Sequence, residues 1–287
     1  MDHDYPNAVR LARDEICRQW PCEPRAAVAL GTGLGALTRH LQCEATIPLC
    51  ALAGFPQTTA PGHSGRIVCG RLGGVPLIVF DGRYHLYEGH PVDLITLPVR
   101  VAHTCGAPML IVSNASGGLN PHYTHGDVVV IDDQISFMRR GLPTSAPASA
   151  GKSDRPARTG SAPYDEPLVL HALQVARRHN FVAHRGVYVG VTGPNYETRA
   201  EYRFLRWIGG DVVGMSTVSE VMVAHALGMR VLGLSVVTNV ASPDAPQVVD
   251  AAEVIDAAAH AEPHIRQIVA DVVATGGIRG GRTNDEI

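Results

Sequence analysis

Several polar side chains that suit an oxyanion site stand directly after short apolar runs of the chain. A glycine-rich turn at residues 31–35 (Gly-Thr-Gly-Leu-Gly) follows one run and carries the hydroxyl of Thr32. Arg83 and Ser216 follow two other runs. Glycines let backbone N–H groups approach a ligand closely, and the forked guanidinium of an arginine matches the oxygens of a phosphate. These residues predict a site for phosphate, either free or as part of a nucleotide or dinucleotide.

The glycine turn by itself leaves several interpretations open. Gly31, Gly33 and Ala36 fit the spacing of a dinucleotide-binding turn, which would indicate an NAD-dependent oxidoreductase. That fingerprint also needs an acidic residue about 20 positions later, and residues 50–57 contain neither Asp nor Glu. No Gly-Lys-Ser/Thr follows, so a P-loop is not indicated. The turn could also be a tight connection from a strand to a helix whose N-terminus favours an anion.

Alternating strands and helices are needed to bring these groups to one edge of a sheet. Apolar runs predict strands, and apolar residues three or four apart predict helices. The predicted strands are residues 26–30, 75–80, 108–113, 128–132, 186–192, 211–215 and 230–238. The predicted helices are residues 5–20, 34–41, 93–105, 168–178, 198–207, 217–227 and 251–273. Strand alternates with helix, which predicts an α/β fold with ligands at the carboxyl ends of the strands.

The composition argues against several classes of protein. The 287 residues are 45% hydrophobic, enough for a sizeable core, and the net charge of −3 implies no basic face for nucleic acid. No apolar run approaches the ~18 residues of a membrane span. The six cysteines form no Cys-x-x-Cys pair and predict reduced, mostly buried thiols in a cytoplasmic protein. His122 and His125 lie in a turn with proline and glycine, which favours a solvated loop over a metal site.

The chain shows no sharp change of composition, so we expect a single domain over residues 1–275. Residues 141–163 are rich in Pro, Ser, Ala and Gly and predict a flexible loop. Residues 276–287 predict a disordered tail.

Six motifs in order resemble those of the trimeric purine nucleoside phosphorylases. They occupy residues 31–35, 61–65, 82–89, 114–120, 193–198 and 214–220. The resemblance implies a single-domain, mixed and distorted β-sheet flanked by helices, and a homotrimer. It also implies reversible phosphorolysis of inosine, guanosine and their deoxy forms to a free purine and (deoxy)ribose 1-phosphate. Inorganic phosphate is then a co-substrate, with no cofactor and no metal.

The resemblance also implies a role for each residue of the site. Inorganic phosphate would be held by Thr32, His63, Arg83, the backbone of Ala115, and Ser216. The nucleoside would be bound by Tyr87, Tyr196, Glu197, Met215 and Asn239. The catalytic residues would be Asn239 at N7 and O6 of the purine, Glu197 on the N1–H side, and His85 toward the 5′-hydroxyl and the phosphate.

The chemistry of phosphorolysis agrees with these roles. When the bond between N9 and C1′ breaks, positive charge develops on the ribose and negative charge on the purine, and both must be stabilised. Arg83 and a histidine would supply the cationic charge for phosphate. An ionised Glu197 suits the N1–H of a 6-oxopurine, whereas adenine presents a bare N1 acceptor. Methylthioadenosine phosphorylases, which have the same fold, carry Asp where Asn239 stands, so Asn239 favours inosine and guanosine.

Two departures from the family pattern keep alternatives open. The family usually carries a histidine for the 5′-hydroxyl at the start of the last helix, whereas residues 248–253 contain none and offer Asp250 instead. Residues 152–164 are shortened and lack the aromatic side chain that a neighbouring subunit often lends to the sugar pocket. The alternatives are a methylthioadenosine phosphorylase and a nucleoside-binding protein of the same fold without turnover.

Overall fold

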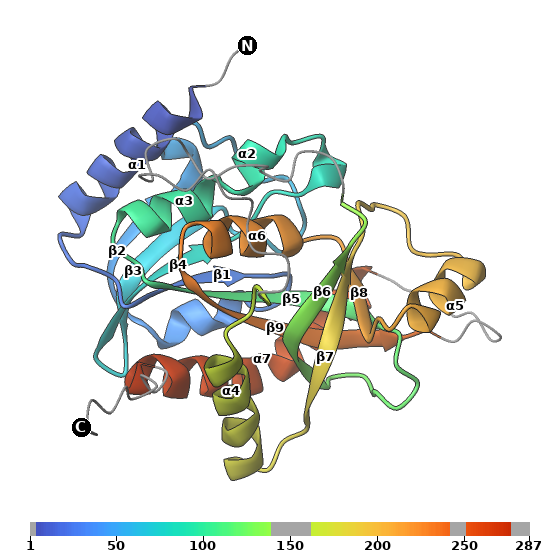
Figure 1. Cartoon of the computed structure of the whole chain (residues 1–287). Helices are drawn as coiled ribbons and strands as arrows, with labels where there is room; N and C mark the ends of the chain where they lie inside the picture. Colours follow the sequence, from blue (N-terminus) through green and yellow to red (C-terminus); the bar gives the residue numbers. More distant parts are fainter. Residues whose placement is uncertain (1–3, 139–161, 242–250, 277–287) are drawn as a thin grey trace, which may run out of the picture.

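The computed structural model describes residues 4–138, 162–241 and 251–276 (Figure 1). The strands in these residues are β1 (Ala26–Leu30), β2 (Gln42–Pro48), β3 (Arg66–Leu72), β4 (Val75–Asp81), β5 (Met109–Gly118), β6 (Val128–Ser136), β7 (Ala183–Gly190), β8 (Val212–Gly214) and β9 (Arg230–Val240). They form one mixed sheet in the order β2-β3-β4-β1-β5-β8-β7-β6-β9. The predicted α/β fold with a mixed sheet is confirmed.

Part of this sheet closes on itself, because β9 pairs with β6 on one edge and with β5 on the other. The ring consists of β5, β8, β7, β6 and β9, and β1, β4, β3 and β2 extend it on one side. β1 runs parallel to β4 and β5, and β5 runs parallel to β9. The carboxyl ends of these four strands therefore meet at one edge, where Arg83, Asn114 and Asn239 lie.

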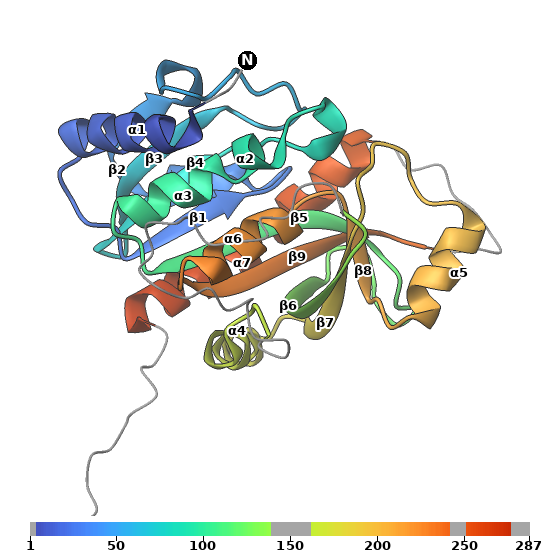
Figure 2. The same ribbon diagram turned by 45° about the horizontal axis from the view of Figure 1, so that its top comes forward.

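Helices cover both faces of the sheet, as the two ribbon views show (Figures 1 and 2). One face carries α1 (Tyr5–Gln19), α2 (Val92–Ile95), α3 (Leu97–Thr104) and α6 (Val218–Ala226). The other face carries α4 (Glu166–Arg178) and α7 (Ala251–Thr275). α5 (Arg199–Trp207) packs through Leu205 against Val189 and Val213, at the far end of the ring. None of the helices in the described ranges is both long and apolar enough to cross a membrane.

The local structure differs from the sequence prediction in three places. Residues 34–41 were expected to form an α-helix but form the 3-10 helix η1 (Gly35–His40), because the chain already enters β2 at Gln42. The helix expected at residues 93–105 is broken between α2 and α3, since Pro98 has no N–H to donate and instead lies in the first turn of α3. β2 and β3 were not predicted, and β2 is a largely exposed edge strand without an apolar run.

The cysteines also differ from expectation. All six are free thiols, but only Cys69 is buried, and Cys43 and Cys50 are exposed. The prediction of mostly buried thiols is wrong.

Some of the predicted segments lie outside the described residues. Only the last two residues of the loop at 141–163 and the first residue of the tail at 276–287 are described, and Asp250 is not described. The domain limits 1–275 stay a prediction.

Candidate active site

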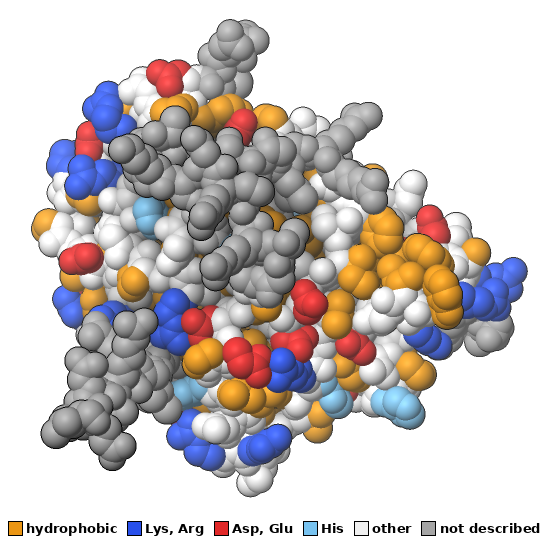
Figure 3. All heavy atoms as spheres, viewed as in Figure 1, with side chains coloured by type: hydrophobic (Ala, Val, Ile, Leu, Met, Phe, Trp, Pro, Cys, Tyr) orange, Lys and Arg blue, Asp and Glu red, His pale blue; other side chains and the backbone are white. Residues whose placement is uncertain are grey.

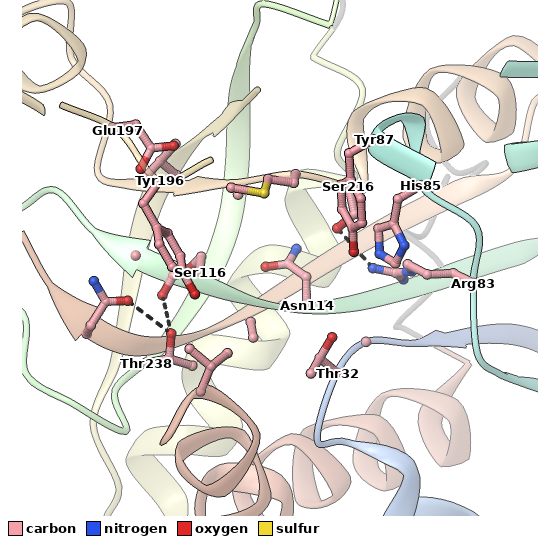
Figure 4. Close-up of a pocket in the computed structure, with 18 of the residues that line it drawn as sticks. Thr32, Arg83, His85, Tyr87, Asn114, Ser116, Tyr196, Glu197, Ser216 and Thr238 are labelled. Atoms are coloured by element: carbon pink, nitrogen blue, oxygen red, sulfur yellow. Dashed lines mark hydrogen bonds between the residues drawn. The ribbon is translucent and has the colours of Figure 1, made fainter. Parts of the chain in front are cut away.

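A cavity of about 140 Å³ opens at the carboxyl ends of β1, β5, β8 and β9 (Figure 4). Its lining includes every predicted site residue except His63, namely Thr32, Arg83, His85, Tyr87, Ala115, Tyr196, Glu197, Met215, Ser216 and Asn239. His63 lies behind this lining, with its ring centroid 5.3 Å from that of His85. Figure 4 shows two ends: Arg83, His85, Tyr87 and Ser216 at one, and Ser116, Tyr196, Glu197 and Thr238 at the other, with Asn114 between them.

Arg83 is a buried cation whose position is fixed by the protein. Its side chain is 3% exposed. One terminal nitrogen donates to the Ser216 hydroxyl at 3.1 Å and the other to the carbonyl of Ala29 at 3.2 Å. Its Nε lies 3.6 Å from the carboxylate of Glu220, which is equally buried. The buried partner of Arg83 is therefore Glu220 of α6.

Two glycines allow the backbone to bring these groups together. A Cβ on Gly31 would lie 2.6 Å from the Ser113 carbonyl oxygen and 2.7 Å from Asn114 Cα, so only glycine lets this turn lie directly on β5. Gly82 has a φ of +134°, and its missing Cβ makes room for the Gly65 amide nitrogen. The turn at residues 31–32 lines the cavity itself, and it leads into the short 3-10 helix η1 rather than into an α-helix.

Ser216 is presented by a strained turn. Thr217 has φ +72° and ψ −53°, and the Val218 N–H donates to the Ser216 carbonyl at 2.8 Å, which makes residues 216–218 a γ-turn. Such a backbone costs on the order of 1–3 kcal/mol for a residue other than glycine. It is held by the Thr217 N–H, which donates to Glu220 at 3.1 Å, and by Asn114 Nδ2, which donates to the Thr217 hydroxyl at 2.9 Å. Glu220 therefore fixes both Arg83 and the turn that carries Ser216.

Burial favours the neutral form of His85 and His63. Burial lowers the pKa of His85 to about 4, even though its Nδ1 lies 2.7 Å from the Glu88 carboxylate, and burial lowers the pKa of His63 to about 3. Because the Glu88 carboxylate accepts a hydrogen bond from Nδ1–H, Nε2 of a neutral His85 is left as an acceptor. The ring also stacks on Tyr87, with centroids 4.7 Å apart. In the free protein, burial disfavours the charged form of both histidines, and Arg83 is a buried cation at this end of the cavity.

The other end of the cavity carries groups that suit a heterocyclic base. Burial raises the pKa of Glu197, which also shares a hydrogen bond with Tyr202. The single hydrogen of the Thr238 hydroxyl can be donated to Oδ1 of Asn239 at 3.3 Å or to the Ser116 carbonyl at 3.2 Å. These contacts orient the Asn239 amide. A carboxylate and an amide on the same wall can together accept from and donate to one planar ring.

A chain of buried polar side chains joins the two ends. The Ser235 hydroxyl donates to Asn114 Oδ1 at 2.6 Å, and the Ser116 and Ser235 hydroxyls are 2.6 Å apart. Together with the bond from Asn114 to Thr217, these contacts run from the Arg83 end to the Asn239 end. Sequence reasoning missed Ser116, Ser235, Tyr202 and Glu220. Polar residues 114 and 116 are two positions apart and so lie on one face of β5, which was a usable signal.

Comparison with known proteins finds relatives over most of the chain. Residues 25–274 match the family model of the phosphorylase superfamily. Purine nucleoside phosphorylase 1 of Bacillus subtilis is 40% identical over 93% of this chain and 97% of its own length. The purine nucleoside phosphorylase of Bos taurus is 37% identical, covering 88% and 89%. The crystal structure of a schistosoma purine nucleoside phosphorylase in complex with hypoxanthine has a TM-score of 0.85 and 35% identity, covering 93% of this chain and 96% of that one.

Proposed function

This chain belongs to the purine nucleoside phosphorylases of the phosphorylase superfamily, and we propose that its substrates are the 6-oxopurine nucleosides inosine and guanosine and their deoxy forms. Inorganic phosphate is the proposed co-substrate, and the products are the free purine and (deoxy)ribose 1-phosphate. The observation that carries this proposal is that Glu197 and Asn239 line the same cavity as the buried cation Arg83.

At the phosphate end, Arg83 would neutralise the anion while Ser216, Thr32 and the Ala115 backbone donate hydrogen bonds. His63 and His85 would complete this end, and the neutral Nε2 of His85 would accept from a protonated phosphate oxygen or from the 5′-hydroxyl. A phosphate oxygen forms the new bond to C1′ as the bond from C1′ to N9 breaks. The electron pair of the broken bond passes to the purine, which leaves as an anion.

At the base end, Asn239 would donate from its amide to N7 of the departing purine, where negative charge develops. An ionised Glu197 would accept from N1–H and, in guanine, from the 2-amino group. Tyr196 would pack on sugar and base, while Tyr87 and Met215 would border the ribose. Donors and acceptors held in these positions before the substrate binds would not need to reorganise when the transition state forms.

Turnover of four nucleosides with and without phosphate tests the proposal. We expect inosine and guanosine to release their bases only when phosphate is present. Adenosine and methylthioadenosine should react at least about 100-fold more slowly, since a site built around one hydrogen-bonding pattern rejects the wrong one. Base release without phosphate would indicate hydrolysis, faster cleavage of methylthioadenosine would contradict the assignment of Glu197 and Asn239, and binding without any turnover would indicate a nucleoside-binding protein.

The second part of the proposal is a homotrimer. A cluster of exposed aromatic side chains at α5 supports a subunit contact, because Trp207 is 82% exposed and Phe204 packs between it and Phe137. Figure 3 shows hydrophobic side chains gathered on the side of the molecule where α5 lies. Light scattering after gel filtration should give three times the chain mass, and a monomer at micromolar concentration would contradict the proposal.

A further inference from the structure

A β-bulge stands directly before Asn239. In the ladder between β5 and β9, Ser116 faces Val237 and Gly117 faces Asn239, so Thr238 is the extra residue that no β5 residue faces. A bulge bends its strand and re-aims the neighbouring side chain, and bulges are common beside active sites. The direction of the Asn239 amide therefore depends on how the Thr238 peptide is held.

The Thr238 carbonyl accepts a hydrogen bond from a residue outside the cavity. His125 Nδ1 lies 2.9 Å from this oxygen. A carbonyl oxygen only accepts, so Nδ1 must carry the hydrogen, and protonation of Nε2 leaves this bond in place. His125 belongs to the segment between β5 and β6, is exposed, and is not part of the cavity lining.

The same segment is bonded to β9 just before the bulge. The Gly126 N–H donates to the Val237 carbonyl at 2.8 Å, and the Val237 N–H donates to the Asp127 carbonyl at 2.9 Å. The Asp127 carboxylate in turn accepts from the Thr124 N–H at 2.8 Å and lies 2.9 Å from Nε2 of His184. His125 thus extends from an anchored segment and can hold the bulge in one position.

We propose that His125 is a positioning residue for purine recognition. Its Nδ1–H holds the bulged Thr238 peptide, while the Thr238 hydroxyl binds the Ser116 carbonyl on β5, and the Asn239 amide is thereby directed at the base. This inference rests on the proposed contact of Asn239 with the purine. His125 is exposed, as expected for a solvated turn at residues 122–125, and its Nδ1 also contacts β9.

The test compares His125→Ala with His125→Asn and His122→Ala in phosphorolysis of inosine. Loss of one hydrogen bond of ordinary strength should lower kcat/KM for inosine about tenfold in His125→Ala. The Asn side chain places an amide nitrogen where Nδ1 stood, so kcat/KM of His125→Asn for inosine should lie within about threefold of the wild-type value. His122 is exposed in the same segment, and its replacement should change nothing. The KM for phosphate should be unchanged in all three variants.

A double-mutant cycle shows whether His125 acts through Asn239. In an Asn239→Ala background, His125→Ala should cause no further loss, because the side chain that it directs is gone. Equal kcat/KM in wild type and His125→Ala, or the same loss in both backgrounds, would overturn the inference. Should His125→Ala melt at a lower temperature, His125→Phe, which keeps a ring without a donor, replaces it in the cycle. An inactive wild-type protein would refute the proposed function instead.

Discussion

Replacing Glu220 by Gln should make the protein less stable and its phosphate site stronger. Glu220 and Arg83 form a buried pair with side chains 3% exposed, and the Glu220 carboxylate also accepts from the Thr217 N–H. Gln keeps an oxygen for the Thr217 N–H but removes the negative charge beside Arg83. The cation is then unpaired until phosphate arrives.

The magnitude follows from the burial of this pair. Removing one partner of a buried ion pair costs ~3–5 kcal/mol, and we take ~3 because the hydrogen bond to Thr217 survives. At about 2 °C per kcal/mol for a chain of this size, Tm should fall by roughly 6 °C without phosphate. In the variant, bound phosphate is no longer repelled by the charge of the Glu220 carboxylate, so we expect the Kd of phosphate to fall about tenfold. At saturating phosphate, this tighter binding restores ~1.4 kcal/mol of the lost free energy of unfolding.

Scanning calorimetry without phosphate and with saturating phosphate, together with titration calorimetry for its Kd, checks both numbers. Glu262→Gln is a matched control, since Glu262 is also buried and lies 3.3 Å from Arg266 but is outside the cavity. This variant should lose stability by the same amount with and without phosphate. A Glu220→Gln variant with unchanged phosphate Kd, or with equal Tm losses under both conditions, would refute the reasoning.

Three further changes test other parts of the site. Glu197→Gln should lower kcat/KM for inosine about 10- to 100-fold, since a hydrogen bond to a charged group contributes ~1.5–3 kcal/mol. Burial raises the pKa of Glu197 above 4.5, and binding of the purine needs the ionised carboxylate. Wild-type kcat/KM should therefore fall as the pH drops through this raised pKa. The same fall at acid pH in the Glu197→Gln variant would contradict the role of Glu197 in binding the purine. Asn239→Asp should raise the ratio of adenosine to inosine cleavage, and an unchanged ratio argues against the base assignment. Gly31→Ala should lose ~1–3 kcal/mol in urea unfolding, because its Cβ would lie 2.6 Å from the Ser113 carbonyl oxygen, and a neutral result would mean that the turn can move.

The buried strands could be predicted from the sequence because both of their faces are covered. β1 is buried at all five positions and reads as an unbroken apolar run, so its limits were predicted at the observed residues. β2 lies at the edge of the sheet and is mostly exposed, which leaves no such pattern. The end of η1 depends on where the next strand pairs, and local spacing carries no information about that pairing.

The candidate site was predictable wherever a polar residue closely follows an apolar run, as Arg83, Ser216 and Asn239 do, although Asn239 itself lies within β9. Residues that act on these through tertiary contacts could not be found in this way. Glu220 lies in the first turn of α6, and its contact with Arg83 joins residues far apart in the chain. The contact of His125 could not be predicted either, because its partner is the backbone carbonyl of Thr238. Thr238 is the bulged residue of β9, and no β5 residue faces it.

The ring of strands has a consequence for how the protein regains activity after denaturation. Met109 of β5 faces Arg230 of β9, so the last pairing of the ring joins segments separated by much of the chain. Such distant pairings must offset a large loss of chain entropy and form slowly. On dilution from urea, helical circular dichroism should return before inosine cleavage does. Simultaneous recovery of the two signals would show that the ring closes together with the helices.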